Sequence, residues 1–189
     1  MASTHVPIIT GTFNGTLDGN DKKITLNTAL CYRIGDYGCV KNLRFTCTIS
    51  DTGGGSAYTY CYGYDLGGLY SYVFGSIALT NLGLIDNCQG DVNINMFHNT
   101  NANRLSIGGI AGEMGFYQQT HNNAKIRNWG VTGSIYCKTN QATGSVAHAG
   151  GIASYGYTGG RIEYCYTYAK VRCEGSDLRN GTLGGEALN

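Results

Sequence analysis

Two stretches of this sequence carry the same motif. The first is Ile107-Gly-Gly-Ile110-Ala-Gly112, followed after a polar loop by Ile126-Arg-Asn-Trp-Gly-Val-Thr-Gly-Ser-Ile-Tyr-Cys137. The second is Ala149-Gly-Gly-Ile152-Ala-Ser154, followed by Ile162-Glu-Tyr-Cys-Tyr-Thr-Tyr-Ala-Lys-Val-Arg-Cys173. Repetition of one motif at a similar spacing is typical of solenoid proteins. The two stretches are therefore predicted to be successive coils of one solenoid.

Further copies of the motif extend toward both ends of the chain. Residues 40–49 align with 126–135, and apolar side chains occupy every second position after Leu43, as in a strand with one buried face. Glycine pairs begin at Gly67, Gly108, Gly150 and Gly184, at spacings of 41, 42 and 34 residues. Between the first two pairs, the strand motif matches either residues 77–84 or residues 85–88. We expect the strands to repeat at equivalent positions in every coil and the loops between them to vary in length.

The composition favours short strands and tight turns. The 189 residues include 30 glycines, 15 tyrosines and one proline, and only 13% of residues are charged. Such a chain is poor in helix formers and rich in residues that favour strands. Residues 8–26 alternate apolar and polar side chains around Asn-Gly and Asp-Gly steps, which predicts two or three short strands joined by turns.

Together these patterns predict an all-β protein, a right-handed parallel β-helix (β-solenoid) of about four to five coils with long polar loops. Residues 1–189 are predicted to form a single domain. Residues 1–50 are the opening coil, residues 51–98, 99–144 and 145–182 are successive repeats, and residues 183–189 begin an incomplete coil.

The charge balance and the absence of long apolar runs exclude several classes of partner. The net charge is +1, so no basic surface is expected to attract nucleic acid. No apolar run is long enough to span a membrane. The start, Met1-Ala-Ser-Thr-His5, lacks the pattern of a signal peptide, so an exported protein would be represented here by a mature form or a fragment.

The eight cysteines do not follow a metal-binding pattern. They include no CxxC pair and no Cys/His cluster with zinc spacing, so no metal or cofactor is expected. Cys137 and Cys173 both lie eleven residues after the isoleucine that begins their motif, which predicts that they stack as neighbours. Stacked in this way, they are either a disulfide or two buried thiols.

The tyrosines are the strongest candidates for a binding surface. At a period of two, side chains on a strand project from one face. Rings on an outer face would form a flat, amphipathic surface suited to sugars or proteins, and the alternative is that loops cover them. The residues concerned are Tyr58, Tyr60, Tyr62, Tyr64, Tyr164, Tyr166 and Tyr168.

No catalytic residues are predicted, and the protein is not expected to be an enzyme. Its carboxylates are dispersed, whereas sugar-cleaving enzymes need them clustered or paired at a defined separation. No Ser/His/Asp or Cys/His arrangement follows from the spacing either. Two sequons, at Asn14 and Asn180, fit glycosylation of a secreted protein, although Asn-Gly is also a common turn dipeptide.

The repeated motif resembles the GLUG repeat, in which a Gly-Gly-aliphatic step precedes an isoleucine strand that contains an Asn-Cys pair. The resemblance covers about residues 60 to 189, with Trp129 in place of the usual cysteine in one copy and Tyr164 in place of asparagine in the next. It implies an extracellular or cell-surface element with a structural or binding role and no catalytic residues.

The sequence is compatible with three functions. The first is a homo-oligomeric structural protein, whose solenoid ends stack into a filament or form part of an adhesin. The second is a carbohydrate-binding or phage receptor-binding β-helix that contacts a glycan or host surface through its tyrosines. The third, less favoured, is a polysaccharide lyase or hydrolase.

Overall fold

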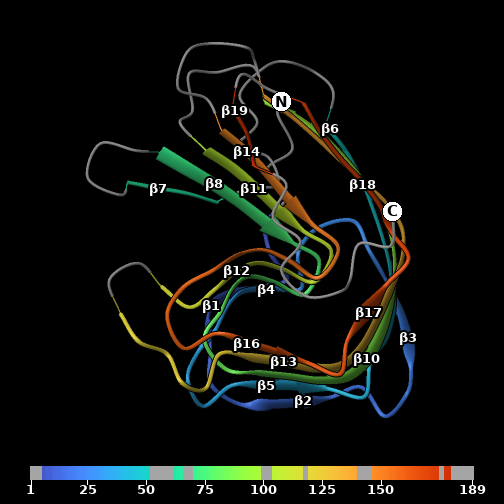
Figure 1. The fold of residues 1–189 in the computed structure, drawn as a ribbon. Coiled ribbons are helices and arrows are strands. Elements are labelled where there is room, and N and C mark those ends of the chain that lie inside the picture. The colour runs from blue at the N-terminus through green and yellow to red at the C-terminus, as the bar shows by residue number, and fades with distance from the viewer. Residues whose placement is uncertain are drawn as a thin grey trace.

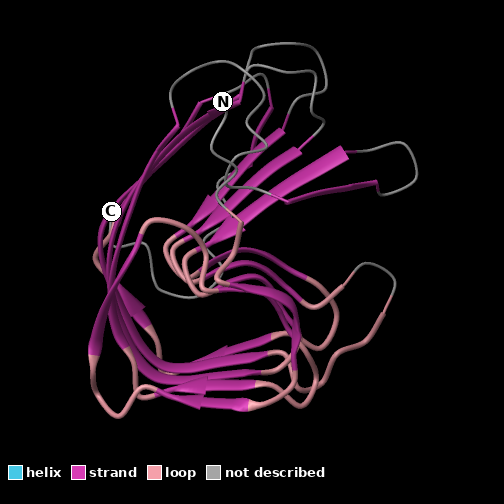
Figure 2. Ribbon diagram, turned by 180° about the vertical axis from the view of Figure 1, so that it is seen from behind, coloured by secondary structure: helices cyan, strands magenta, loops and turns pink. Residues whose placement is uncertain are grey.

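The computed structural model describes residues 6–51, 62–65, 70–98, 104–116, 119–139, 146–174 and 177–179. These residues form strands joined by turns, and none of them lies in a helix (Figure 2). Adjacent strands run parallel in every pairing except that of β7 with β8. The predicted all-β class and the predicted parallel pairing are therefore confirmed.

The strands belong to three sheets. Sheet A has five strands in the order β1-β4-β9-β12-β15. Its bounds are β1 Ile9–Phe13, β4 Cys31–Ile34, β9 Ala78–Asn81, β12 Ala111–Met114 and β15 Ala153–Gly156. Sheet C also has five strands, in the order β7-β8-β11-β14-β19. Its bounds are β7 Tyr62–Asp65, β8 Tyr70–Gly75, β11 Arg104–Gly108, β14 Val146–Gly150 and β19 Asp177–Arg179.

Sheet B is the largest of the three and is built around two long strands. The strands β10 (Leu84–His98) and β13 (Lys125–Thr139) pair along almost their whole length. Shorter segments pair on either side of them. These segments are β2 Thr16–Asp18, β3 Lys23–Leu26, β5 Cys39–Lys41, β6 Arg44–Asp51, β16 Arg161–Glu163, β17 Tyr166–Thr167 and β18 Lys170–Glu174.

The chain passes through the sheets in a fixed rotation. After β8 it runs through β9 in sheet A, β10 in sheet B and β11 in sheet C, and then repeats the order with β12, β13 and β14. We call one such passage a circuit. The first circuit differs, because β3 leads directly to β4 and no strand of sheet C lies between them. In Figure 1 the strands of sheet B lie nearly over one another, from blue to red.

Equivalent positions of successive circuits lie side by side. Val40 pairs with Ile85, Ile85 with Ile126 and Ile126 with Ile162, which confirms the alignment of these stretches. The structure also chooses between the two registers left open by the sequence, because the copy of the strand motif is 85–88. Residues 78–81 instead form β9, opposite β12.

One part of the repeat prediction is wrong. The position equivalent to Gly108 and Gly150 is Gly75 and not Gly67, which lies outside the described residues. A Cβ on Gly108 would lie 1.8 Å from the Ala111 carbonyl oxygen, and one on Gly75 would lie 2.3 Å from the Gly112 nitrogen. The first position of the corner between sheets C and A therefore requires glycine in both circuits. Ser76 follows Gly75, so the second glycine of the pair is dispensable there.

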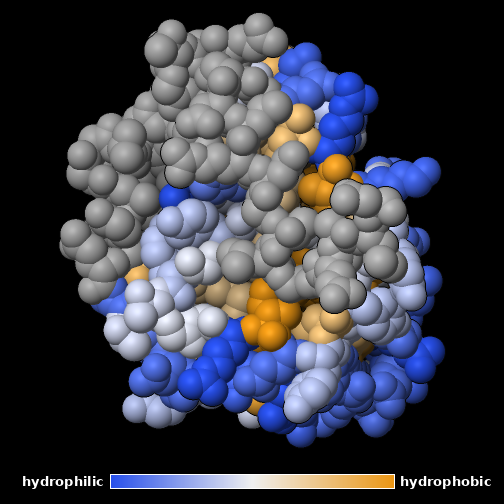
Figure 3. All heavy atoms as spheres, in the orientation of Figure 1, coloured by the Kyte–Doolittle hydropathy of each residue, from blue (hydrophilic) through white to orange (hydrophobic). Residues whose placement is uncertain are grey.

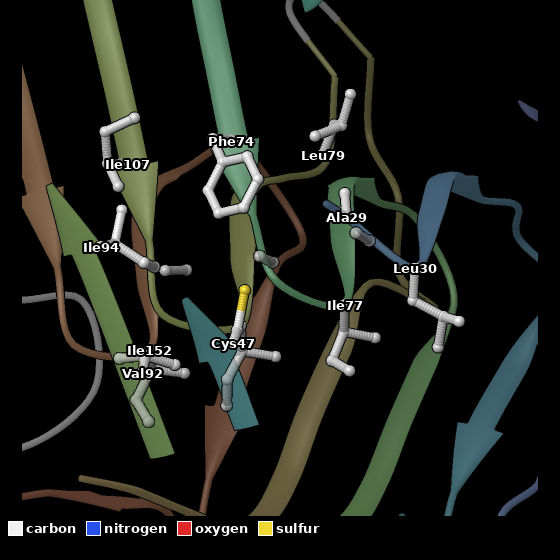
Figure 4. Close-up of a cluster of buried hydrophobic side chains, with 14 of the residues drawn as sticks. Ala29, Leu30, Cys47, Phe74, Ile77, Leu79, Val92, Ile94, Ile107 and Ile152 are labelled. Atoms are coloured by element: carbon white, nitrogen blue, oxygen red, sulfur yellow. The ribbon is translucent and has the colours of Figure 1, made fainter. Parts of the chain in front are cut away.

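The core fills the space between the three sheets. Phe74 and Ile107 from sheet C lie near Val92 and Ile94 from sheet B in Figure 4. The largest buried side chain is that of Trp129, whose ring centroid lies 5.8 Å from that of Phe45. Near the N-terminus, β1, β2 and β3 supply the short strands predicted for residues 8–26. The core thus extends through all circuits as a continuous stack.

Candidate functional site

The predicted tyrosine surface is only partly within the described residues. Tyr58 and Tyr60 lie outside them, and Tyr62 and Tyr64 belong to β7, whose side chains are not described. The second set is exposed: Tyr164 is 85% exposed, Tyr166 48% and Tyr168 73%.

The second set includes a corner of the chain. Tyr164 has a left-handed backbone with φ of 55° and lies at the corner between β16 and β17. Residues 164, 166 and 168 are all more exposed than residues 165 and 167 between them, although the chain turns at Tyr164. Tyr166 and Tyr168 remain neighbours, with ring centroids 5.6 Å apart.

A groove of about 310 Å³ lies on the outer surface of sheet B beside Tyr166. The Tyr166 ring extends over Gly130, where an added Cβ would come within 2.3 Å of it. Because Gly130 has no side chain, the Tyr166 ring can pack directly against the backbone of the sheet. The groove is lined by Lys23, Arg44, Phe45, Thr46, Gln89, Gly90, Asp91, Gly130, Thr132 and Tyr166.

The groove is lined by both positively and negatively charged side chains. Asp91 accepts a hydrogen bond from the Thr132 hydroxyl at 3.0 Å. Lys23 and Arg44 have no ion-pair partner in the part of the chain that the structure describes. An aromatic ring with carboxylate, amide and guanidinium groups nearby is the combination that recognises the faces and hydroxyls of a sugar.

A ladder of asparagines marks the corner within sheet B. Asn42, Asn87 and Asn128 all have positive φ, at 51°, 50° and 55°. The Asn87 side chain donates a hydrogen bond to that of Asn42 at 2.7 Å, and the Asn128 side chain donates to Asp86 at 2.9 Å. Asparagine tolerates this conformation better than other non-glycine residues. Tyr164 continues the left-handed corner but not the amide ladder.

A ladder of alternating charge runs beside the asparagines. It consists of Asp18, Lys41, Asp86, Arg127 and Glu163 in successive circuits. The Lys41 Nζ atom lies 3.3 Å from the Asp18 carboxylate, and the Arg127 guanidinium donates a hydrogen bond of 2.7 Å to the Asp86 carboxylate. Burial raises the pKa of Asp86, but the hydrogen bonds from Arg127 and Asn128 outweigh it and lower that pKa overall. The ladder holds neighbouring circuits in register.

The apolar ladders are less buried at both ends of the stack than in the middle. Several apolar residues of the first and last circuits are packed against the core but only partly buried, although Leu26 in the first circuit and Ala153 in the last are buried, and the partners of these partly buried residues in the central circuits are buried. Figure 3 shows apolar surface in orange between polar regions on the face seen in Figure 1. The partly buried residues include Ile9, Phe13, Leu17 and Ile24 at one end, and Ile162, Ala169 and Val171 at the other.

The cysteines predicted to stack lie opposite each other. Cys137 of β13 is the register partner of Cys173 of β18, and both are free thiols, as are the other cysteines within the described residues. A hydrogen bond from Cys137 lowers the pKa of Cys173, whereas burial raises the pKa of Cys31 to about 12.

A buried ion pair was not anticipated from the sequence. Arg104 of β11 contacts the fully buried carboxylate of Glu113 in β12 and also donates to the Tyr157 hydroxyl at 2.8 Å. The Arg104 guanidinium lies over the Tyr155 ring, 4.6 Å from its centroid. The pair spans the corner between sheets C and A, and a lone acid in an apolar stretch is its only sequence signal.

The remaining polar groups include further isolated contacts. His121 lies 3.0 Å from Asp36 beside a second depression of about 290 Å³. Among the described residues, no three His, Cys, Asp or Glu side chains are grouped as a metal site would require. No helix in the described ranges has the length and apolar character needed to cross a bilayer. Asn14 is exposed between β1 and β2, and Asn180 lies outside the described residues.

Comparison with protein-family models, with curated proteins and with solved structures finds no match for this chain. The GLUG resemblance therefore stays an expectation from the sequence.

Proposed function

We propose that the chain is a parallel β-solenoid with a structural role, whose copies stack end to end through their first and last circuits. Its partners are other copies of the same chain. The proposal extends to an extracellular or cell-surface location, which is supported by the GLUG resemblance alone.

The observation that carries the proposal is the change in burial along one ladder. Val40, Ile85 and Ile126 are completely buried in the central circuits. Leu17 and Ile162 occupy the same ladder at its two ends and are only partly buried. A second copy stacked on the last circuit would cover Ile162 with its Leu17. Removing this apolar surface from water favours the contact.

The sheet edges support the same arrangement. In sheet B, β2 and β16 each pair with a strand on one side only within the described residues. Edge strands present backbone N–H and C=O groups that can pair with a further strand. The contact joins different ends of two copies, so it is heterologous and does not close on itself. The expected product is an unbranched filament.

Sedimentation velocity and electron microscopy over a wide range of protein concentration test the proposal. We expect a concentration-dependent transition from small particles to filaments. The substitution Ile162→Lys places a charge at the end of the apolar ladder and should abolish the transition. Asn93→Lys, on the exposed outer face of β10 and paired on both sides, is the control and should leave it intact. Particles that stay monomeric at every concentration would contradict the proposal.

A second candidate function is carbohydrate binding in the groove of sheet B. It is favoured by the Tyr166 ring on Gly130 and by the nearby Asp91, Gln89 and Arg44 side chains. Glycan-array binding by the unmodified protein should be lost in Tyr166→Ala. Tyr37→Ala is the matched control, because Tyr37 is also exposed but lies outside this groove. Equal binding by both variants, or no binding by the unmodified protein, would remove this function.

A further inference from the structure

We infer that two copies meet in one register, in which Arg161 of one copy pairs with Asp18 of the second copy and Tyr166 contacts Lys23 of the second copy. This inference rests on the proposed end-to-end stacking and specifies the chemistry of its interface.

The register follows from the pairing within sheet B. Neighbouring segments pair without a shift in two outward-facing ladders. Continuing this register into a second copy places its Thr16 beside Arg161 and its Asp18 beside Glu163. These ladders are Thr16-Cys39-Leu84-Lys125-Arg161 and Asp18-Lys41-Asp86-Arg127-Glu163.

Direct continuation alone would oppose two carboxylates. Glu163 of one copy would face Asp18 of the second copy, and like charges directly opposite each other on adjacent strands are destabilising. A diagonal ion pair of the kind that would offset this repulsion already occurs within the chain. Lys125 reaches diagonally to Glu163 of the next circuit at 3.8 Å, although its direct partner is Arg161. By the same diagonal step, Arg161 reaches Asp18 of the second copy.

Arg161 is available for this contact. Its side chain is exposed, and it has no ion-pair partner among the residues that the structure describes. Asp18 is also exposed, and its hydrogen bond from the Asn20 backbone lowers its pKa, so it is charged at neutral pH. The two groups therefore have opposite charges and lie at opposite ends of the stack.

A second contact recurs in the same way. Lys138 lies over the Phe97 ring, and Arg172 over the Tyr136 ring, each 5.5 Å from the centroid. In both cases the cation belongs to the circuit after that of the ring and occupies the directly paired position. Tyr166 of the last circuit is the ring without a following circuit within the described residues. In the continued ladder Gln89-Gly130-Tyr166, the next residue is Lys23 of the second copy.

Charge-reversal variants of the full chain test the register, with the critical concentration for assembly as the readout. Arg161→Glu should raise this concentration by roughly two- to fivefold at low salt, the range for an exposed ion pair. Combining it with Asp18→Lys should restore much of the loss, because the charges are then exchanged. Glu163→Gln should lower the critical concentration, since it removes the like-charge contact. Arg44→Glu, on a strand flanked on both sides, should change it little.

The outcomes separate this inference from the proposed function. Unfolding midpoints of all variants establish that each one folds. Assembly that is equally insensitive to Arg161→Glu, Glu163→Gln and Arg44→Glu would overturn the register and leave end-to-end stacking in place. Failure of the unmodified protein to assemble at any concentration would overturn both.

Discussion

Cys137 and Cys173 face each other on the adjacent parallel strands β13 and β18, and Cys173 accepts a hydrogen bond from the Cys137 thiol. Neighbouring strands lie about 4.8 Å apart, which is within the Cα separation that a disulfide spans. The pair is therefore poised to be bridged by an oxidant.

Cys173 should be the most reactive of the described thiols. The Cys137 hydrogen bond lowers its pKa, so its thiolate is present at lower pH than usual, and its side chain is partly exposed. Burial raises the pKa of Cys47 to about 11 and that of Cys88 to about 12, so both should resist alkylation. Timed iodoacetamide labelling with peptide mass spectrometry measures the order, and equal labelling rates for Cys173 and Cys88 would refute it. Cys137→Ala removes the hydrogen-bond donor and should slow labelling of Cys173.

Arg104→Ala should destabilise the fold strongly. It leaves the Glu113 carboxylate buried without its charged partner, which typically costs about 3–5 kcal/mol. Lys41→Ala removes the exposed pair with Asp18 and should cost less than about 1 kcal/mol. Urea unfolding of both variants gives the comparison. Arg104→Ala combined with Glu113→Gln should recover part of the loss, and similar stabilities for Arg104→Ala and Lys41→Ala would contradict the role of the buried pair.

Gly108→Ala should be among the most damaging small substitutions. The added Cβ would lie 1.8 Å from the Ala111 carbonyl oxygen, and this backbone cannot move without displacing β12. We expect a loss of at least about 2 kcal/mol in the free energy of unfolding. Gly11→Ala is the matched control, because its Cβ would meet nothing within 4 Å. The explanation fails if thermal unfolding shows equal effects.

Tyr164→Asn should stabilise the protein. Tyr164 has a left-handed backbone at the position where Asn42, Asn87 and Asn128 lie in earlier circuits. Asparagine adopts this conformation with less strain, so we expect a gain of about 0.5–1 kcal/mol. Tyr168→Asn changes another exposed tyrosine without a left-handed backbone and should give no such gain. A denaturation midpoint for Tyr164→Asn at or below that of the unmodified chain would show that the corner is not strained.

The repeated motif allowed much of the fold to be predicted. Alternating apolar residues fix which positions of successive strands face the core and pair with each other. The sequence therefore predicts that Val40, Ile126 and Ile162 belong to one ladder. The number of residues in each circuit could not be predicted from the apolar pattern. The paired positions Ile9, Cys31, Ala78, Ala111 and Ala153 are 22, 47, 33 and 42 residues apart, because loops vary without disturbing the sheets.

The misplaced and missed features have physical causes. The glycine-pair pattern points to Gly67, but the equivalent corner position is Gly75, which is followed by a serine and so does not begin a glycine pair. The period-two pattern of Tyr164, Tyr166 and Tyr168 does not reveal the positive φ at Tyr164, the first of the three. Arg104 and Glu113 come together only when sheets C and A meet at a corner, which no local pattern encodes.

The axial repeat of the assembled protein tests the central claim most directly. Five circuits, spaced about 4.8 Å apart, predict that each subunit adds about 24 Å along the fibre, with strands perpendicular to the fibre axis. Cryo-electron microscopy or fibre diffraction of assembled protein measures this rise. A rise near 24 Å with continuous strand spacing across subunits is the expected result, and fibres whose subunits meet side by side would contradict the account.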